Sequence, residues 1–198
     1  MRNNYWEMNV LNTPNKLTLL RVVLIPVYMI LFLECGRVGL YLALAVFIIA
    51  ALTDWLDGNI ARRTRQVTTF GKLMDPLADK LLTQAAFICF LAVGTPYINA
   101  WVVMIILARE LLVTGVRMLA MGEQRVIAAS MLGKLKTVSQ FLLIIVTLIN
   151  SIVETYREPM SGGIGNFFVL VLVIITVALT VLSGVDYVLK NKKLITFK

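Results

Sequence analysis

Long apolar stretches separated by short polar segments dominate the chain. A helix that crosses a membrane needs about 20 mostly apolar residues, and six stretches come close to that length or exceed it. We therefore predict membrane-spanning helices over residues 17–33, 39–63, 73–93, 98–121, 131–152 and 167–189. The segments between them hold Gly, Pro and charged residues, which are typical of turns and loops.

Composition supports a membrane protein over a soluble one. Of the 198 residues 59% are hydrophobic and only 15% are charged, and the mean hydropathy is +0.85. An average soluble domain has about 45–50% apolar and about 25% charged residues. We predict one all-α membrane domain over residues 1–198, a bundle of about six transmembrane helices that begins with a short interfacial segment at residues 1–16.

The residue types that are missing narrow the chemistry. The chain has no histidine, and its two cysteines, Cys35 and Cys89, lie too far apart in sequence to suggest a zinc motif or a disulfide framework. Acid–base catalysis must then use carboxylates, Lys, Tyr or Cys. The net charge of +8 favours anionic lipid headgroups and phosphate-bearing substrates over nucleic acid as partners.

The distribution of basic residues predicts the orientation. With six spans, both termini lie on the same side as the second–third and fourth–fifth connections. All of the 19 Lys and Arg residues except Arg37 and Arg157 belong to that side or to the adjoining helix ends. Because cytoplasmic segments carry the excess of Lys and Arg, we predict that the termini and these two connections face the cytoplasm.

Four aspartates interrupt the apolar pattern near that side: Asp54, Asp57, Asp75 and Asp79. Ionisable residues within spans are costly and usually functional. At about 100° per residue, the first two share one helix face and the last two share a face of the next helix. A short polar bend joins these helices, so we expect them to pack as antiparallel neighbours with all four carboxylates in one pocket.

Four clustered carboxylates repel one another unless cations intervene, and hard divalent ions bind carboxylate oxygens without His or Cys. Small residues at Gly58, Ala61 and Gly71 allow a phosphate to approach the backbone, and the Arg62 fork suits phosphate oxygens. The alternative is structural: Asp57 pairs with Arg62, Asp79 pairs with Lys80, and the small residues serve helix packing.

In order, the segment over residues 54–79 reads Asp54-x-x-Asp57-Gly58-x-x-Ala61-Arg62, eight residues, then Gly71-x-x-x-Asp75-x-x-x-Asp79. It resembles the signature of the CDP-alcohol phosphotransferase family at every fixed position, and the six-span plan resembles that family too. The resemblance implies two divalent cations, Mg²⁺ or Mn²⁺, bound by Asp54, Asp57, Asp75 and Asp79. It also implies that Asp79 is the general base, and that CDP is bound by Gly58, Ala61, Arg62 and Gly71.

A second region, Arg109 to Arg117 followed by Ala129 to Thr137, resembles the phosphatidylglycerophosphate synthase branch of the family, as does the stretch from Pro14 to Arg21. This resemblance implies transfer of a phosphatidyl group from CDP-diacylglycerol to sn-glycerol 3-phosphate, giving phosphatidylglycerophosphate and CMP. It further implies a homodimer in the bacterial cytoplasmic membrane, with the active site on the cytoplasmic side.

A dianionic acceptor requires cations, and three lie near the cytoplasmic ends of the fourth and fifth spans: Arg109, Arg117 and Lys134. We predict that they bind the acceptor phosphate. In the alternative, Arg109 pairs with Glu110 or a neighbouring helix, while Arg117 and Lys134 extend to the interface. Lys136 is interpreted equally well as a charge that only sets topology.

Three other functions stay open. A sibling enzyme would use inositol, inositol phosphate, serine or phosphatidylglycerol as acceptor, and a neutral acceptor would not need the three cations. A transporter would place carboxylates near mid-membrane and show repeat symmetry, whereas these aspartates lie at the boundary and no repeat is visible. A non-catalytic scaffold would retain its function after an Asp79→Asn substitution.

Overall fold

The computed structural model describes residues 13–64, 69–122, 130–155 and 163–191, with side chains throughout except at 13–19, 21, 54–79, 119, 121 and 122. All regular structure in these ranges is helical, which confirms the predicted all-α class. The helices are α1 (Thr13–Glu34), α2 (Gly36–Thr64), α3 (Thr69–Ala92), α4 (Ala100–Gly122), α5 (Met131–Glu154) and α6 (Ile164–Lys190). The expected interfacial segment at residues 1–16 lies mostly outside the described residues.

The turn between α1 and α2 is as tight as the sequence predicts. Only Cys35 separates the two helices, and Gly36 has a φ of +57°, a left-handed conformation that glycine adopts without steric cost. Three residues later, a side chain at Gly39 would collide with the backbone carbonyl of Leu31. These two glycines let α2 turn back and pack closely along α1.

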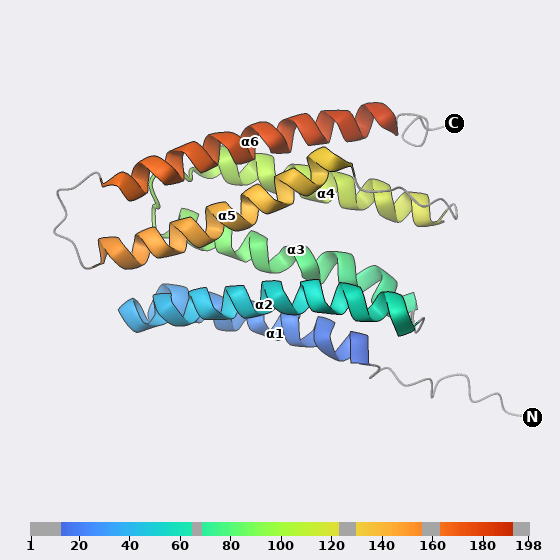
Figure 1. Ribbon diagram of the computed structural model, residues 1–198, viewed down its shortest axis with the longest axis horizontal. Helices are drawn as coiled ribbons and strands as arrows, with labels where there is room; N and C mark the ends of the chain where they lie inside the picture. The colour runs from blue at the N-terminus through green and yellow to red at the C-terminus, as the bar shows by residue number, and fades with distance from the viewer. Residues whose placement is uncertain (1–12, 65–68, 123–129, 156–162, 192–198) are drawn as a thin grey trace, which may run out of the picture.

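The six helices form an elongated bundle whose helices run up and down its long axis (Figure 1). The most extensive packing joins α5 to α6 and α1 to both α2 and α3, while α4 packs on α6 and α3. Across the described residues α2 packs on α1 and α5 rather than extensively on α3. The expected direct α2–α3 packing concerns residues 54–79, whose side chains lie outside the described residues, so it stays a prediction.

Aromatic side chains from four helices fill the centre of the bundle. Tyr28 and Phe32 of α1 stack with ring centroids 6.0 Å apart, and Phe32 meets Phe90 of α3 edge-on at 5.5 Å. Phe47 of α2 lies 6.3 Å from Tyr28 and 5.6 Å from Phe141 of α5. Aromatic pairs in these arrangements add to the gain from apolar burial, so this cluster ties α1, α2, α3 and α5 together.

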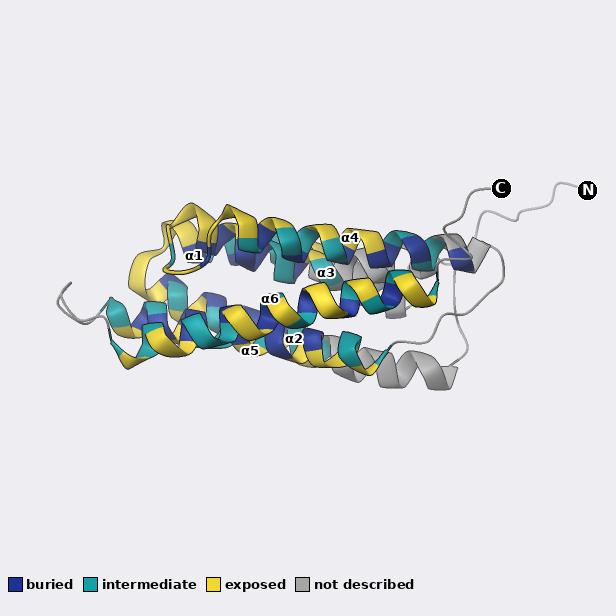
Figure 2. Ribbon diagram, turned by 90° about the horizontal axis from the view of Figure 1, so that it is seen from above, coloured by how far each residue is buried: buried dark blue, intermediate teal, exposed yellow. Residues whose placement is uncertain are grey.

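Many large apolar side chains are exposed, among them Ile30, Ile49, Trp101 and Ile174, as expected of a surface that faces lipid, and Figure 2 shows exposed residues along the outer faces of the helices. In the described chain three helices are long and apolar enough to cross a membrane, over Gly36–Thr53, Met131–Glu154 and Ile164–Lys190. At most 39% of any of these windows is buried inside the protein, which leaves most of their apolar side chains facing outwards. The chain is therefore a helical membrane protein.

The other three helices have similar lengths but are interrupted by charge or only partly described. α4 has 23 residues and carries Arg109 and Glu110 near its middle and Arg117 in its last third. In α1 and α3 the described apolar segments are too short to count as full spans; they cover Val22–Glu34 and Lys80–Ala92. The charges that disqualify α4 as a plain lipid-facing span are also the ones that form the site described next.

Candidate active site

The predicted aspartates belong to two helix segments at one end of the bundle. Asp54 and Asp57 lie in the last third of α2, and Asp75 and Asp79 lie in the first half of α3. The end of α2, the start of α3, the end of α4 and the start of α5 share this end of the bundle with the start of α1 and the end of α6 (Figure 1). This arrangement agrees with the predicted topology.

The side chains of residues 54–79 lie outside the described residues. Whether the four carboxylates converge therefore stays a prediction. The same holds for the predicted CDP-binding residues, which are Gly58, Ala61, Arg62 and Gly71.

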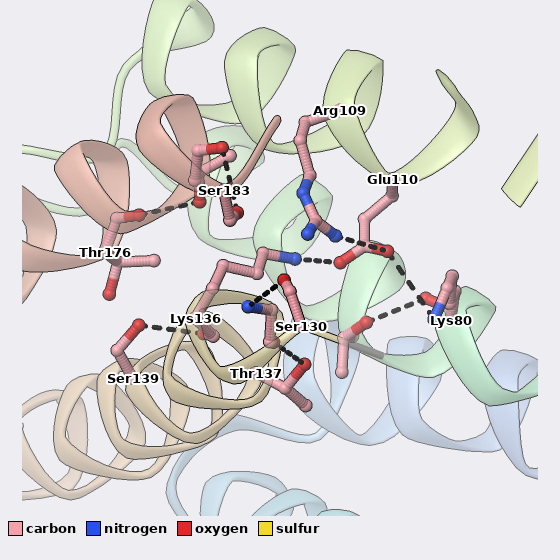
Figure 3. A network of polar contacts seen from close by, with 12 residues as sticks. Lys80, Arg109, Glu110, Ser130, Lys136, Thr137, Ser139, Thr176 and Ser183 are labelled. Carbon is pink, nitrogen blue, oxygen red and sulfur yellow. Dashed lines mark hydrogen bonds and ion pairs between the residues drawn. The ribbon is translucent and has the colours of Figure 1, made fainter. Parts of the chain in front are cut away.

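The best-defined feature of this end is a buried ion-pair network centred on Glu110 of α4 (Figure 3). Its carboxylate accepts a hydrogen bond through Oε1 from the Nζ of Lys136 on α5, and both side chains are buried. Its Oε2 lies 3.5 Å from the Nζ of Lys80 on α3 and 3.9 Å from a terminal guanidinium nitrogen of Arg109. One carboxylate thus links cations from three helices.

Charged side chains buried inside a membrane helix bundle are costly and need an explanation. An ion pair buried in a bundle is weak evidence for stability, because well-packed apolar residues of the same volume often serve as well or better. Ionisable groups inside a membrane bundle usually mark a functional site. The network gathers cations from three helices around Glu110, and the buried Nε of Arg109 has no hydrogen-bond partner among the described residues, which suits the binding of an anion.

The Arg109 side chain connects this network to an apolar groove between α4 and α6. The groove has a volume of about 460 Å³, and its other walls include Leu112, Val181 and Val185. The Cγ of Arg109 packs over Gly184, 3.2 Å from where a Cβ would lie, so α6 leaves room for this side chain. Its Nε is buried without a hydrogen-bond partner among the described residues, so it retains a donor for a ligand.

The start of α5 reaches the same arginine. A terminal guanidinium nitrogen of Arg109 lies 3.6 Å from the position that a Cβ at Gly133 would take. Ser130 caps α5 by accepting a hydrogen bond from the backbone N–H of Gly133. The positive end of the α5 dipole therefore points towards the Arg109 side chain, which raises the local preference for an anion.

Of the two other predicted acceptor residues, one is held inside the bundle and one is not. Arg117 lies two turns after Arg109 on α4, with its guanidinium carbon 5.9 Å from the centre of the buried Tyr187 ring on α6, a cation–π contact. Lys134 is exposed. The alternative pairing of Arg109 with Glu110 is present at 3.9 Å, and the acceptor role of the three cations stays a prediction.

Lys136 is the residue that the sequence interpretation undervalued. The sequence explains it equally well as a charge that only sets topology, yet its side chain is fully buried and bound to Glu110. Residues two apart on a helix project about 200° apart, so Lys134 and Lys136 must point to different sides of α5. The apolar flanks of Lys136 on the inward face of α5, Leu132 and Leu143, were a usable signal.

Three buried hydroxyl groups near the network, those of Ser139, Thr180 and Ser183, are satisfied by their own helices. Ser139 donates to the carbonyl of Lys136, Thr180 donates to that of Thr176, and Ser183 donates to that of Thr180 (Figure 3). Such bonds to the preceding turn are usual for Ser and Thr inside helices. These hydroxyls allow close α5–α6 packing without competing for Glu110.

Comparison with known proteins gives consistent matches over most of the chain. The sequence model of the family described as CDP-alcohol phosphatidyltransferase matches residues 11–183. A Bacillus subtilis protein named CDP-diacylglycerol–glycerol-3-phosphate 3-phosphatidyltransferase is 40% identical over 193 residues, covering 91% of this chain and 95% of its own length. Proteins of the same name from Escherichia coli K12 and Sodalis glossinidius are 36% and 35% identical. They cover 66% and 70% of this chain, and 73% and 77% of their own lengths.

Proposed function

This chain belongs to the CDP-alcohol phosphatidyltransferase family, and we propose that it transfers a phosphatidyl group from CDP-diacylglycerol to sn-glycerol 3-phosphate. The products are phosphatidylglycerophosphate, a precursor of phosphatidylglycerol, and CMP. The proposal takes its substrates from relatives at 35–40% identity whose names state this reaction.

The observation that carries the choice of acceptor is the cationic network. Lys80, Arg109 and Lys136 gather around one carboxylate in the middle of α4, and Lys80 directly follows Asp79 of the aspartate signature on α3. A doubly charged phosphate monoester needs such cations, whereas serine or inositol does not. Arg109, Arg117 and Lys134 are the residues we propose to contact the acceptor phosphate.

The reaction is an in-line displacement at the phosphorus atom bonded to the lipid. The acceptor hydroxyl oxygen forms a bond to this phosphorus, the bond to the bridging oxygen of CMP breaks, and CMP leaves. Asp79 accepts the hydroxyl proton. Arg62 stabilises negative charge on the transferring group with its planar fork, and Gly58, Ala61 and Gly71 let the diphosphate approach the helix backbone.

Two divalent cations, Mg²⁺ or Mn²⁺, fit the donor set of this segment. Asp54 and Asp57 on α2 and Asp75 and Asp79 on α3 supply only carboxylate oxygens, the ligands that hard cations prefer. Two such ions neutralise four carboxylates, and when bound they stabilise the attacking and leaving oxygens of a phosphoryl transfer. We propose these four residues as the metal ligands.

The membrane position follows from the same distribution of charge. We propose that the enzyme lies in the bacterial cytoplasmic membrane with its termini and active site facing the cytoplasm, since the basic residues cluster at this end. The acyl chains of the donor then stay among membrane lipids while the cytidine reaches water. A homodimer is proposed from the family resemblance alone.

An acceptor panel tests the function. With labelled CDP-diacylglycerol, the purified protein is expected to release CMP at the highest kcat/KM with glycerol 3-phosphate. Serine and inositol should each be at least about 100-fold poorer, since loss of the phosphate contacts removes about 3 kcal/mol. Inositol phosphate and phosphatidylglycerol, which keep a phosphate group, should also be poorer, and they test whether the site selects the glycerol part of the acceptor. Preference for any of these four would assign a sibling activity, and absence of CMP release with all five would exclude the enzyme class.

Replacing Lys134 by alanine tests the acceptor site. We expect the KM for glycerol 3-phosphate to rise about tenfold, the value of one charge-assisted hydrogen bond of about 1.4 kcal/mol, while the KM for CDP-diacylglycerol stays unchanged. The matched control is Lys190→Ala, because Lys190 is also exposed and pairs only with Asp186 on its own helix among the described residues. Equal effects of the two substitutions would remove Lys134 from the acceptor site.

A further inference from the structure

Glu110 differs from the other acidic side chains that the structure describes. Glu34, Glu154 and Asp186 lie near helix ends, whereas Glu110 is buried in the middle of α4, with 6% of its surface exposed. It sits at ion-pair distance from cations on α3, α4 and α5. We propose that Glu110 is a positioning residue for the transfer reaction, holding Arg109, one of the proposed acceptor-binding cations, and the helix of Asp79 in register. This inference rests on the proposed function.

The two carboxylate oxygens divide the task. Oε1 takes the hydrogen bond from Lys136, which anchors α5 to α4. Oε2 faces Lys80 and Arg109 and has no hydrogen-bond partner among the described residues. Because both oxygens are engaged by cations, the carboxylate cannot rotate without weakening an attraction. Its ion pairs therefore hold α3 and α5 in fixed positions relative to α4.

The ion pair between Lys80 and Glu110 positions the predicted base, Asp79. Lys80 follows Asp79 directly in α3, and neighbouring positions on a helix project about 100° apart. Holding the Lys80 ammonium 3.5 Å from Glu110 Oε2 therefore restrains the rotation of α3 about its own axis at the turn that contains Asp79. A small rotation there would move the base relative to the acceptor hydroxyl, and misplacement by about 1 Å can reduce turnover about 100-fold.

The ion pair between Arg109 and Glu110 positions the guanidinium that we propose binds the acceptor phosphate. The guanidinium is restrained by Glu110 at 3.9 Å, a distance for electrostatic attraction rather than a hydrogen bond, so its donors are not consumed. The carboxylate also reduces the repulsion among three gathered cations. Glu110 thus links the group that binds the acceptor phosphate to the helix that bears the base, without touching substrate itself.

The test separates positioning from simple stabilisation. In purified Glu110→Gln, we expect kcat to fall at least about 30-fold and the KM for glycerol 3-phosphate to rise about tenfold, with the KM for CDP-diacylglycerol within about twofold of wild type. A residue that only supported folding would lower the amount of active enzyme and leave both KM values unchanged. That result, or wild-type kinetics, would overturn the proposal.

A second variant keeps the test open if Glu110→Gln does not fold. Lys80→Gln removes the α3 arm of the Glu110 network at a partly exposed side chain, and we expect kcat to fall at least about tenfold with the KM for glycerol 3-phosphate within about threefold. Unchanged kcat in folded Lys80→Gln would overturn the α3 link. Asp186→Asn, which breaks the partly exposed pair with Lys190, is the control and should behave as wild type.

Failure of the proposed function gives a different result. If the wild-type protein releases no CMP with glycerol 3-phosphate, the proposed function falls and the role of Glu110 falls with it. If the wild type is active and Glu110→Gln changes neither kcat nor the acceptor KM, only the role of Glu110 is overturned.

Discussion

Asp79→Asn is expected to abolish phosphatidyl transfer, with kcat lowered at least about 1000-fold. General-base catalysis contributes about 100- to 10,000-fold, and asparagine keeps the size of aspartate but can neither accept the proton nor offer a charged oxygen to a cation. The measurement is CMP release from labelled CDP-diacylglycerol by the purified protein with Mg²⁺ and saturating glycerol 3-phosphate.

Two controls isolate the chemical role of Asp79. The helical circular dichroism and thermal midpoint of Asp79→Asn should match the wild type, because removing one charge from a carboxylate cluster does not weaken the bundle. Asp186→Asn on α6 changes an aspartate far along the chain from the signature and should keep full activity. Near-wild-type turnover in folded Asp79→Asn would exclude it as the base and would favour a scaffold role.

The positions of the helices were predictable because each membrane helix is a long run of mostly apolar residues in the sequence. The apolar range predicted at 131–152 corresponds to α5 at Met131–Glu154, and that at 167–189 to α6 at Ile164–Lys190. Both helices begin directly after residues that often precede a helix, Ser130, which caps α5, and Gly163, which stands before α6. Apolar length and turn residues are local properties, so a single sequence carries them.

Helix neighbours were harder to predict than helix positions. A four-residue link between α2 and α3 predicts direct packing near residues 54–79, and this stays a prediction because those side chains lie outside the described residues. A short link constrains only the two ends it joins. The packing of α1 against both helices along their described length depends on side chains far apart in sequence, such as the tilted pair of Tyr28 and Phe47.

The candidate site shows the same division. The aspartate spacing predicts the reactive segment from the chain alone, because motif residues are close in sequence. The Glu110 network could not be predicted in this way, since its members come from α3, α4 and α5 and its centre is an acid among basic residues. The sequence favours Lys134 over Lys136 for the acceptor site, whereas the rotation of α5 places Lys134 outside and Lys136 in the core.

Removal of divalent cations is the second change expected to have a very large effect. Treatment of the purified protein with EDTA should reduce CMP release at least about 1000-fold, and added Mg²⁺ or Mn²⁺ should restore it. Without cations, four nearby carboxylates would retain protons through mutual repulsion, and the charge on the transferring phosphate would lose its strongest stabilisation.

Direct measurement of binding shows whether this effect belongs to the aspartates. Electron paramagnetic resonance of Mn²⁺ should show about two bound ions for each wild-type chain, the number that neutralises four carboxylates, and fewer in Asp75→Asn. Glu154→Gln, a change of carboxylate at the opposite end of the bundle on α5, should bind as the wild type does. Full activity after chelation, or equal Mn²⁺ binding in all three proteins, would exclude a metal site formed by α2 and α3. Retained binding with lost activity in Asp79→Asn alone would instead separate the base from the ligand set and assign proton transfer as its main role.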